Sequence, residues 1–153
     1  MGLKDELQLK KPLSSLEHEA LLNLYYTAAR LKKRAGEFFG PYGLTDVQFH
    51  VMMLLRHQGG LEGLSQARLS ELMQVNRPNI TGLVDRLERE GFVRRTAAED
   101  RRYNIIQLSD KGNCLLDEAD GAYGAEMGKV MGALNKTELA ALIDACGKLR
   151  QNL

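Results

Sequence analysis

Two helical patterns in the middle of the sequence are separated by only a few residues, and this joint constrains the fold more than any other feature. Ser65 is placed to cap a short helix that ends near Met73. After residues 74–76 the next helix begins, with Asn76 as its cap and Pro78 in its first turn, where the missing N–H is tolerated. Two helices joined this tightly indicate a helix-turn-helix.

The second of these helices is followed directly by a pattern typical of a β-hairpin. Its apolar residues, Ile80, Leu83, Val84 and Leu87, form one stripe, and Gly91 is a natural C-terminal stop. Residues 92–96 and 103–108 then change to the composition of strands, joined by the polar tip 97–102. A hairpin in this position is called a wing, so we expect a winged helix-turn-helix.

Amphipathic patterns flank this central region on both sides. Apolar residues recur at steps of three and four from Leu16 to Phe39, which predicts a long first helix that ends at residues 40–43. Thr45 is placed to cap a second helix. After the hairpin, Ser109 caps a helix toward Met131, and Thr137 begins a last one. The fold class that follows is mainly α with a small β-hairpin wing, in a single domain over residues 1–153.

The composition is that of a globular chain without a membrane span. The 153 residues are 44% hydrophobic and 27% charged, which is enough to bury a sizeable core. No stretch approaches the ~20 consecutive apolar residues that a membrane span needs, so we expect a cytoplasmic protein with no membrane partner. The net charge of +1 argues neither for nor against a polyanionic partner, because phosphate attraction depends on how cations cluster in space.

The sequence carries no motif of an enzyme, a cofactor site or a metal site. It has no phosphate-binding glycine loop and no nucleophile elbow, and its three histidines, His18, His50 and His57, lack tight ligand spacing. Two cysteines are too few for a disulfide framework. Cys146 lies in an apolar stripe, and a redox role of Cys114, near a helix start, stays open. We therefore predict no catalysis, no cofactor and no metal.

The outward face of the helix after Asn76 carries groups that can reach base edges. An α-helix fits the major groove, where Arg pairs with guanine, Asn pairs with adenine, and Thr offers its hydroxyl or touches a thymine methyl. A glycine there lets the backbone come close. The candidate contacts are Arg77, Pro78, Asn79, Thr81, Gly82 and Arg86. The alternative is an ordinary solvated helix face.

The hairpin adds four arginines that favour DNA as the partner, namely Arg94, Arg95, Arg101 and Arg102. A narrow minor groove favours inserted Arg. Asp100 lies beside two of them, and we expect it to orient one by a charge-assisted hydrogen bond rather than to touch DNA. A solvated charge run is the alternative, and Glu99 weakens the positive field locally. Helix and wing together predict binding to double-stranded DNA.

The stretch from Leu69 to Gly112 resembles the signature region of the MarR family of winged helix-turn-helix transcriptional regulators. The matching segments are 83–88, Gly91, 100–102 and 108–112, and the upstream segment 44–48 is similar to the family's entry to its second helix. The resemblance implies a homodimer in which dimerisation helices over 14–39 and 110–153 interlock, while the lobes over 44–108 face adjacent turns of a pseudo-palindromic operator. The apolar stripes of the terminal helices support this independently, because a single small domain leaves them little to bury against. A self-contained helical cap is the alternative.

The resemblance also implies regulation by a small molecule. Members of the family commonly release DNA when a small aromatic or phenolic effector binds between the dimer region and the DNA-binding lobe, and repression is their commoner role. The candidate pocket residues are Tyr25, Tyr26, Phe38, Phe49, His50 and Met53, for which plain core packing is the alternative. The family's peroxide sensors carry a cysteine in the first helix region, where this chain has none. Two other functions stay open, a winged-helix protein–protein interaction module and a DNA-binding protein without an effector.

Overall fold

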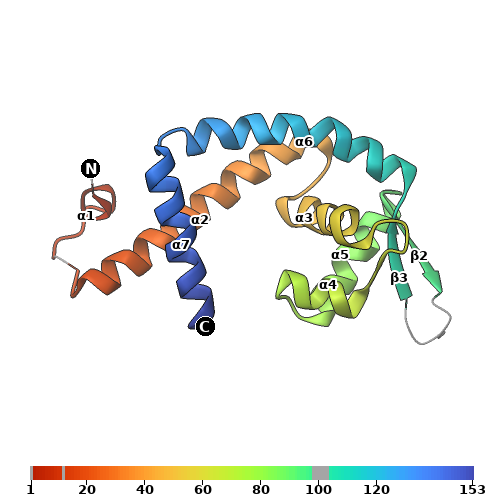
Figure 1. Ribbon diagram of the computed structural model, residues 1–153, viewed down its shortest axis with the longest axis horizontal. Coiled ribbons are helices and arrows are strands. Elements are labelled where there is room, and N and C mark those ends of the chain that lie inside the picture. The colour runs from red at the N-terminus through yellow and green to blue at the C-terminus, as the bar shows by residue number, and fades with distance from the viewer. Residues whose placement is uncertain (1, 12, 98–103) are drawn as a thin grey trace.

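The computed structural model describes residues 2–11, 13–97 and 104–153, and it confirms a mainly helical chain with a small sheet (Figure 1). The helices in chain order are α1 (Leu3–Glu6), α2 (Leu16–Phe39), α3 (Asp46–Leu54), α4 (Gln66–Met73), α5 (Arg77–Arg89), α6 (Asp110–Met131) and α7 (Lys136–Gln151). A 3-10 turn η1 (Gly40–Tyr42) follows α2, and a π-helical turn η2 (Leu55–Gly59) follows α3. None of the helices in these described ranges has the length and apolar character that crossing a bilayer requires.

Three antiparallel strands form the sheet. They are β1 (Leu64–Ser65), β2 (Val93–Ala97) and β3 (Asn104–Leu108), in the spatial order β1-β3-β2. The predicted hairpin is β2 and β3, in register from Val93 opposite Leu108 to Ala97 opposite Asn104. Strand β1 was not predicted, because two residues are too short to carry a periodic pattern. The wing tip with Asp100, Arg101 and Arg102 lies outside the described residues.

Polar side chains cap four helices at the positions that the sequence predicted. The side chains of Thr45, Ser65, Asn76 and Ser109 each accept a hydrogen bond from a backbone N–H three residues later, at 3.0–3.2 Å. The last helix differs from the prediction, because Asn135 rather than Thr137 marks its start. The Asn135 side chain accepts from the N–H groups of both Thr137 and Glu138, so α7 already begins at Lys136.

The core combines buried side chains of α2, α3, α5 and α6. Phe39 of α2 stacks on Phe49 of α3 with ring centroids 4.2 Å apart, and Tyr123 of α6 lies 4.9 Å and 5.1 Å from those two rings. The predicted stripe of α5 is buried in the same core, and α5 contacts α4 and β2. The lobe from α3 to β3 is therefore anchored to the two long helices through one shared core.

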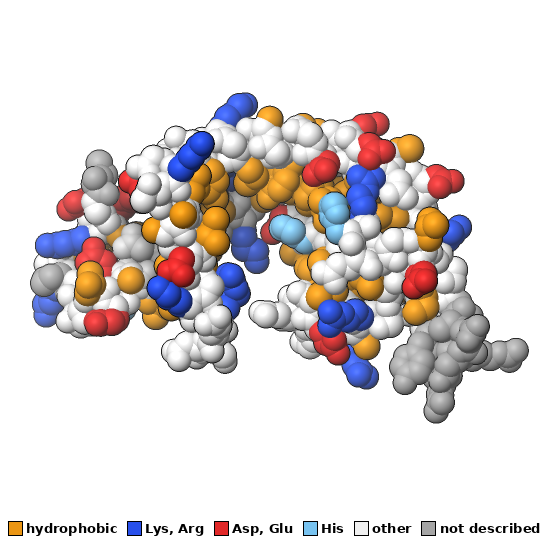
Figure 2. Space-filling model, viewed as in Figure 1, with side chains coloured by type: hydrophobic (Ala, Val, Ile, Leu, Met, Phe, Trp, Pro, Cys, Tyr) orange, Lys and Arg blue, Asp and Glu red, His pale blue; other side chains and the backbone are white. Residues whose placement is uncertain are grey.

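The long helices α2 and α6 form an arch, and the lobe is attached at one end of it. In Figure 1, α2 and α6 converge toward the lobe, and α7 lies at the opposite end of α6, where it overlaps α2 in this view. Arg34 of α2 donates to Glu126 of α6 at 2.8 Å, and Arg56 of η2 donates to Asp117 of α6, also at 2.8 Å. Figure 2 shows a hollow between the two ends, with hydrophobic side chains gathered along its inner surface.

A close backbone contact joins the wing to α6. A Cβ at Gly112 would lie 2.1 Å from the carbonyl oxygen of Phe92, a distance that side-chain carbons do not tolerate. The same carbonyl accepts a hydrogen bond from the N–H of Ser109 at 3.0 Å. The glycine after the Ser109 cap thus lets the first turn of α6 lie directly against the start of β2.

Candidate nucleic-acid interface

Helix α5 presents a polar face to solvent because its opposite face is buried. Ile80, Val84 and Leu87 have no exposed surface, and Leu83 retains 9%. The predicted contacts Arg77, Pro78, Asn79, Thr81 and Arg86 are all exposed, and Gly82 is half-buried. A Cβ at Gly82 would have no heavy atom within 4 Å, so the backbone there is open to a close approach. The structure brings the six residues together on one surface, and their contact with DNA stays a prediction.

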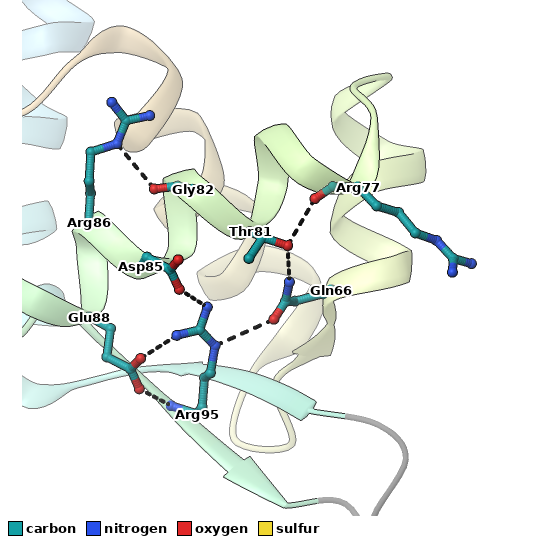
Figure 3. A network of polar contacts seen from close by, with 8 residues as sticks. All are labelled: Gln66, Arg77, Thr81, Gly82, Asp85, Arg86, Glu88 and Arg95. Carbon is teal, nitrogen blue, oxygen red and sulfur yellow. Dashed lines mark hydrogen bonds and ion pairs between the residues drawn. The ribbon is translucent and has the colours of Figure 1, made fainter.

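The side chains of two arginines on α5 project from this surface. The Arg77 guanidinium points away from the start of the helix, and the Arg86 Nε donates to the carbonyl oxygen of Gly82 at 3.1 Å (Figure 3). That single bond to the previous turn holds Arg86 along the helix. Both charges therefore lie on a surface that a polyanion can reach.

Arg95 of β2 lies in a network that fastens the wing to α5. Its guanidinium is ion-paired with Asp85 and Glu88, and its backbone N–H donates to Glu88 at 3.1 Å (Figure 3). Its side chain is 21% exposed. Burial disfavours the charge, but the hydrogen bonds and charges of the two carboxylates outweigh it, so the pKa of Arg95 is raised above its ordinary value. The sequence predicted that Arg95 contacts DNA and did not single out Asp85 and Glu88 as its partners. The signal that could have indicated them is the spacing of these two carboxylates, one helical turn apart on α5.

A glutamine extends this network to the preceding helix. Gln66 of α4 accepts from the Arg95 Nε at 3.4 Å, and its Nε2 donates to the Thr81 hydroxyl at 3.0 Å. Thr81 in turn donates to the carbonyl oxygen of Arg77 at 3.0 Å. One chain of hydrogen bonds therefore joins α4, α5 and the wing.

Arg94, the neighbour of Arg95, is exposed. Its Nε donates to the Gln107 side chain across the hairpin at 3.2 Å, and Gln107 donates to the carbonyl oxygen of Leu61 at 2.7 Å. Successive side chains of a strand point to opposite faces, so Arg94 lies on the other face of β2 from the network. Of the four wing arginines, the structure describes these two.

The structure divides the six predicted pocket residues into three pairs in different surroundings. Phe38 and Phe49 pack in the aromatic cluster, and Phe49 is only 2% exposed, while Tyr25 and Tyr26 lie exposed on α2. His50 and Met53 line a cavity of about 350 Å³. The other lining residues, which the sequence did not single out, are Leu54, His57, Leu72 and Met73. Leu72 and Met73 come from α4. The helical periodicity of α3 does not indicate which other helix packs beside it, so these two residues could not be predicted from it.

Comparisons with known proteins agree with this arrangement. A family model described as the MarR family matches residues 44–103. The HTH-type transcriptional regulator PrsX of Escherichia coli is 30% identical over 131 residues, which are 84% of this chain and 78% of PrsX. The HTH-type transcriptional repressor YetL of Bacillus subtilis is 29% identical over 136 residues, which are 88% of this chain and 81% of YetL. The crystal structure of CouR from Rhodococcus jostii RHA1, bound to p-coumaroyl-CoA, is 25% identical and has a TM-score of 0.77, covering 90% of this chain and 95% of CouR.

The Arg95 network makes a prediction about stability. In Arg95→Ala the carboxylates of Asp85 and Glu88 lose their partner, and we expect the free energy of unfolding to fall by about 1–3 kcal/mol in urea denaturation. Arg94→Ala is the matched control on the same strand, with an expected change within about 0.5 kcal/mol because that side chain is exposed. Equal, small changes in the two variants would contradict a fastening role.

Proposed function

Because this chain belongs to the MarR family of transcriptional regulators, we propose that it binds a pseudo-palindromic operator as a homodimer and represses transcription until a small effector releases it. The family membership confirms the predicted resemblance and the expectation of a regulator rather than an enzyme. The observation that carries the proposal is α5, whose buried apolar face leaves Arg77, Asn79 and Arg86 at the surface beside the wing. Such a helix fits the major groove.

The polar residues of this surface divide into two kinds of contact. Arg86 and Asn79 lie on the recognition helix, where side chains reach base edges and specify sequence. Arg94 lies on the wing, where a guanidinium contacts phosphates or enters the minor groove. Phosphate contacts supply affinity that falls with salt, whereas base contacts supply the preference for one sequence.

The proposal predicts how an α5 arginine contributes to binding. Arg86→Ala should weaken binding to the duplex that the protein selects from a random pool by about 5- to 150-fold, the value of a bidentate base contact. Its binding to a scrambled duplex should change much less. Fluorescence anisotropy at two salt concentrations measures both affinities.

Lys148→Ala, on the polar face of α7, is the control and should leave both affinities unchanged. No affinity of the wild-type protein for any duplex, even at low salt, would instead favour a winged-helix module that contacts another protein.

The terminal helices support the homodimer. Helix α7 exposes Ile143 by 71% and Leu149 by 51%, and α2 exposes Tyr25 by 63%. Further large apolar side chains on these two helices are exposed by 41–48%, namely Leu21, Leu24, Tyr26 and Leu142. An apolar surface of this kind marks an interface, and a second copy of the chain would cover it on both helices. The division into dimerisation helices over 14–39 and 110–153 and a DNA-binding lobe over 44–108 is part of the proposal.

Ile143→Glu tests the dimer. A carboxylate placed in an apolar interface loses its hydration without gaining a partner, so this variant should sediment as a monomer at concentrations where the wild type is a dimer. Lys148→Ala is again the control and should sediment like the wild type. Identical sedimentation of Ile143→Glu and the wild type would place the interface elsewhere.

The cavity between α3, η2 and α4 supports the effector part of the proposal. Leu72 and Met73 of its wall belong to α4, and α4 contacts α5 through the hydrogen bond from Gln66 to Thr81. A ligand that displaces α4 therefore acts on the recognition helix. CouR was solved with an aromatic acyl thioester, and YetL is a repressor. CouR favours an effector with an aromatic group, and YetL favours a repressor.

Filling the cavity should abolish release without abolishing DNA binding. We expect Leu72→Trp to raise the concentration of p-coumarate or salicylate that half-releases the duplex by tenfold or more, measured by anisotropy. Lys148→Trp enlarges an exposed side chain outside the cavity and outside the proposed dimer interface, and it should leave release unchanged. Unchanged release in Leu72→Trp would place the effector site elsewhere, and no release of the wild type by either compound would favour effector-independent DNA binding.

A further inference from the structure

The hydroxyl of Thr81 is already engaged inside the protein. Arg95 can only donate, so the oxygen of the Gln66 amide must face it, and the Gln66 nitrogen must face Thr81 (Figure 3). The Thr81 oxygen accepts from that nitrogen, and its proton goes to the carbonyl oxygen of Arg77. A hydroxyl has a single proton to donate, so Thr81 has no donor left for a base.

Apart from one oxygen lone pair that can still accept, the group that Thr81 has left to offer a base is its methyl. The side chain is exposed on α5, and the two hydrogen bonds hold its oxygen between α4 and the previous turn of the helix. One turn further along the same flank, Arg95 engages one carboxylate oxygen of Asp85. The Thr81 proton and one Asp85 oxygen are therefore already engaged within the protein, and the Thr81 methyl is not.

We propose that Thr81 is a specificity-determining residue that recognises thymine by contact between its methyl and the thymine C5-methyl. The inference rests on the proposed function, in which α5 enters the major groove. There the C5-methyl distinguishes thymine from every other standard base. Gln66 is a positioning residue for this contact, because it fixes the Thr81 oxygen and so fixes the direction of the methyl.

Two substitutions separate the methyl from the hydroxyl. Thr81→Val keeps a methyl in the same branched shape and removes the hydroxyl, whereas Thr81→Ser keeps the hydroxyl and removes the methyl. Replacing thymine by uracil removes the matching methyl from the DNA. Burial of one methyl changes affinity by about fourfold, which competition binding resolves.

The experiment uses the duplex that the wild-type protein selects from a random-sequence pool, with each thymine replaced in turn by uracil in both half-sites. We expect one position at which uracil weakens binding of the wild type and of Thr81→Val by about fourfold per half-site. Thr81→Ser should bind the thymine and uracil duplexes equally.

Two results would overturn the inference while leaving DNA binding intact. One is that the wild type and Thr81→Ser respond alike to uracil at every thymine position of the selected duplex. The other is a Thr81→Val variant that loses affinity while Thr81→Ser retains it, which would assign the contact to the hydroxyl. Failure of the wild type to select any duplex would overturn the proposed function as well, so the two failures are distinguishable.

Discussion

The burial of one face of α5 decides which side chains this protein can offer to a partner. Full burial of an aliphatic side chain contributes about 1.5–3 kcal/mol, whereas an exposed ion pair contributes about 0–1 kcal/mol. Four such side chains, Ile80, Leu83, Val84 and Leu87, lie in the lobe core. A rotation of the helix about its axis would bring them into water, which no rearrangement of surface charges offsets. The outward direction of Arg77 and Arg86 is therefore a consequence of core packing.

The second determinant is where the polar network makes its connections. Gln66 is the point at which α4, α5 and the wing meet, since it contacts both Thr81 and Arg95. The wall of the cavity is formed in part by Leu72 and Met73, which lie on the same short helix as Gln66. A displacement of α4 therefore changes the position of the recognition helix and of the wing together. This shared helix is the connection on which the proposed release of DNA by an effector depends.

The features that the sequence predicted well are those that local chemistry decides. Thr45, Ser65, Asn76 and Ser109 cap helices with their own side chains, so each start was readable within four residues. The cavity and the Arg95 network depend instead on which elements pack together. Periodicity placed His50 and Phe49 on the same helix, but only the packing of α6 on α3 makes Phe49 core and leaves His50 at the cavity. The partners of Arg95 lie 7 and 10 residues earlier in the chain, on another element.

The same network explains why counting basic residues describes the interface poorly. Arg95 adds a positive charge to any sequence count, yet Asp85 and Glu88 lie against its guanidinium and more than neutralise it. Within the described residues, the positive field at this surface comes from arginines whose charge is not balanced in this way, above all Arg77, Arg86 and Arg94. A polyanion responds to the local arrangement of charge and not to its total. A chain with a net charge of +1 can therefore present a basic recognition surface, provided that its core and its internal ion pairs determine which arginines remain outside.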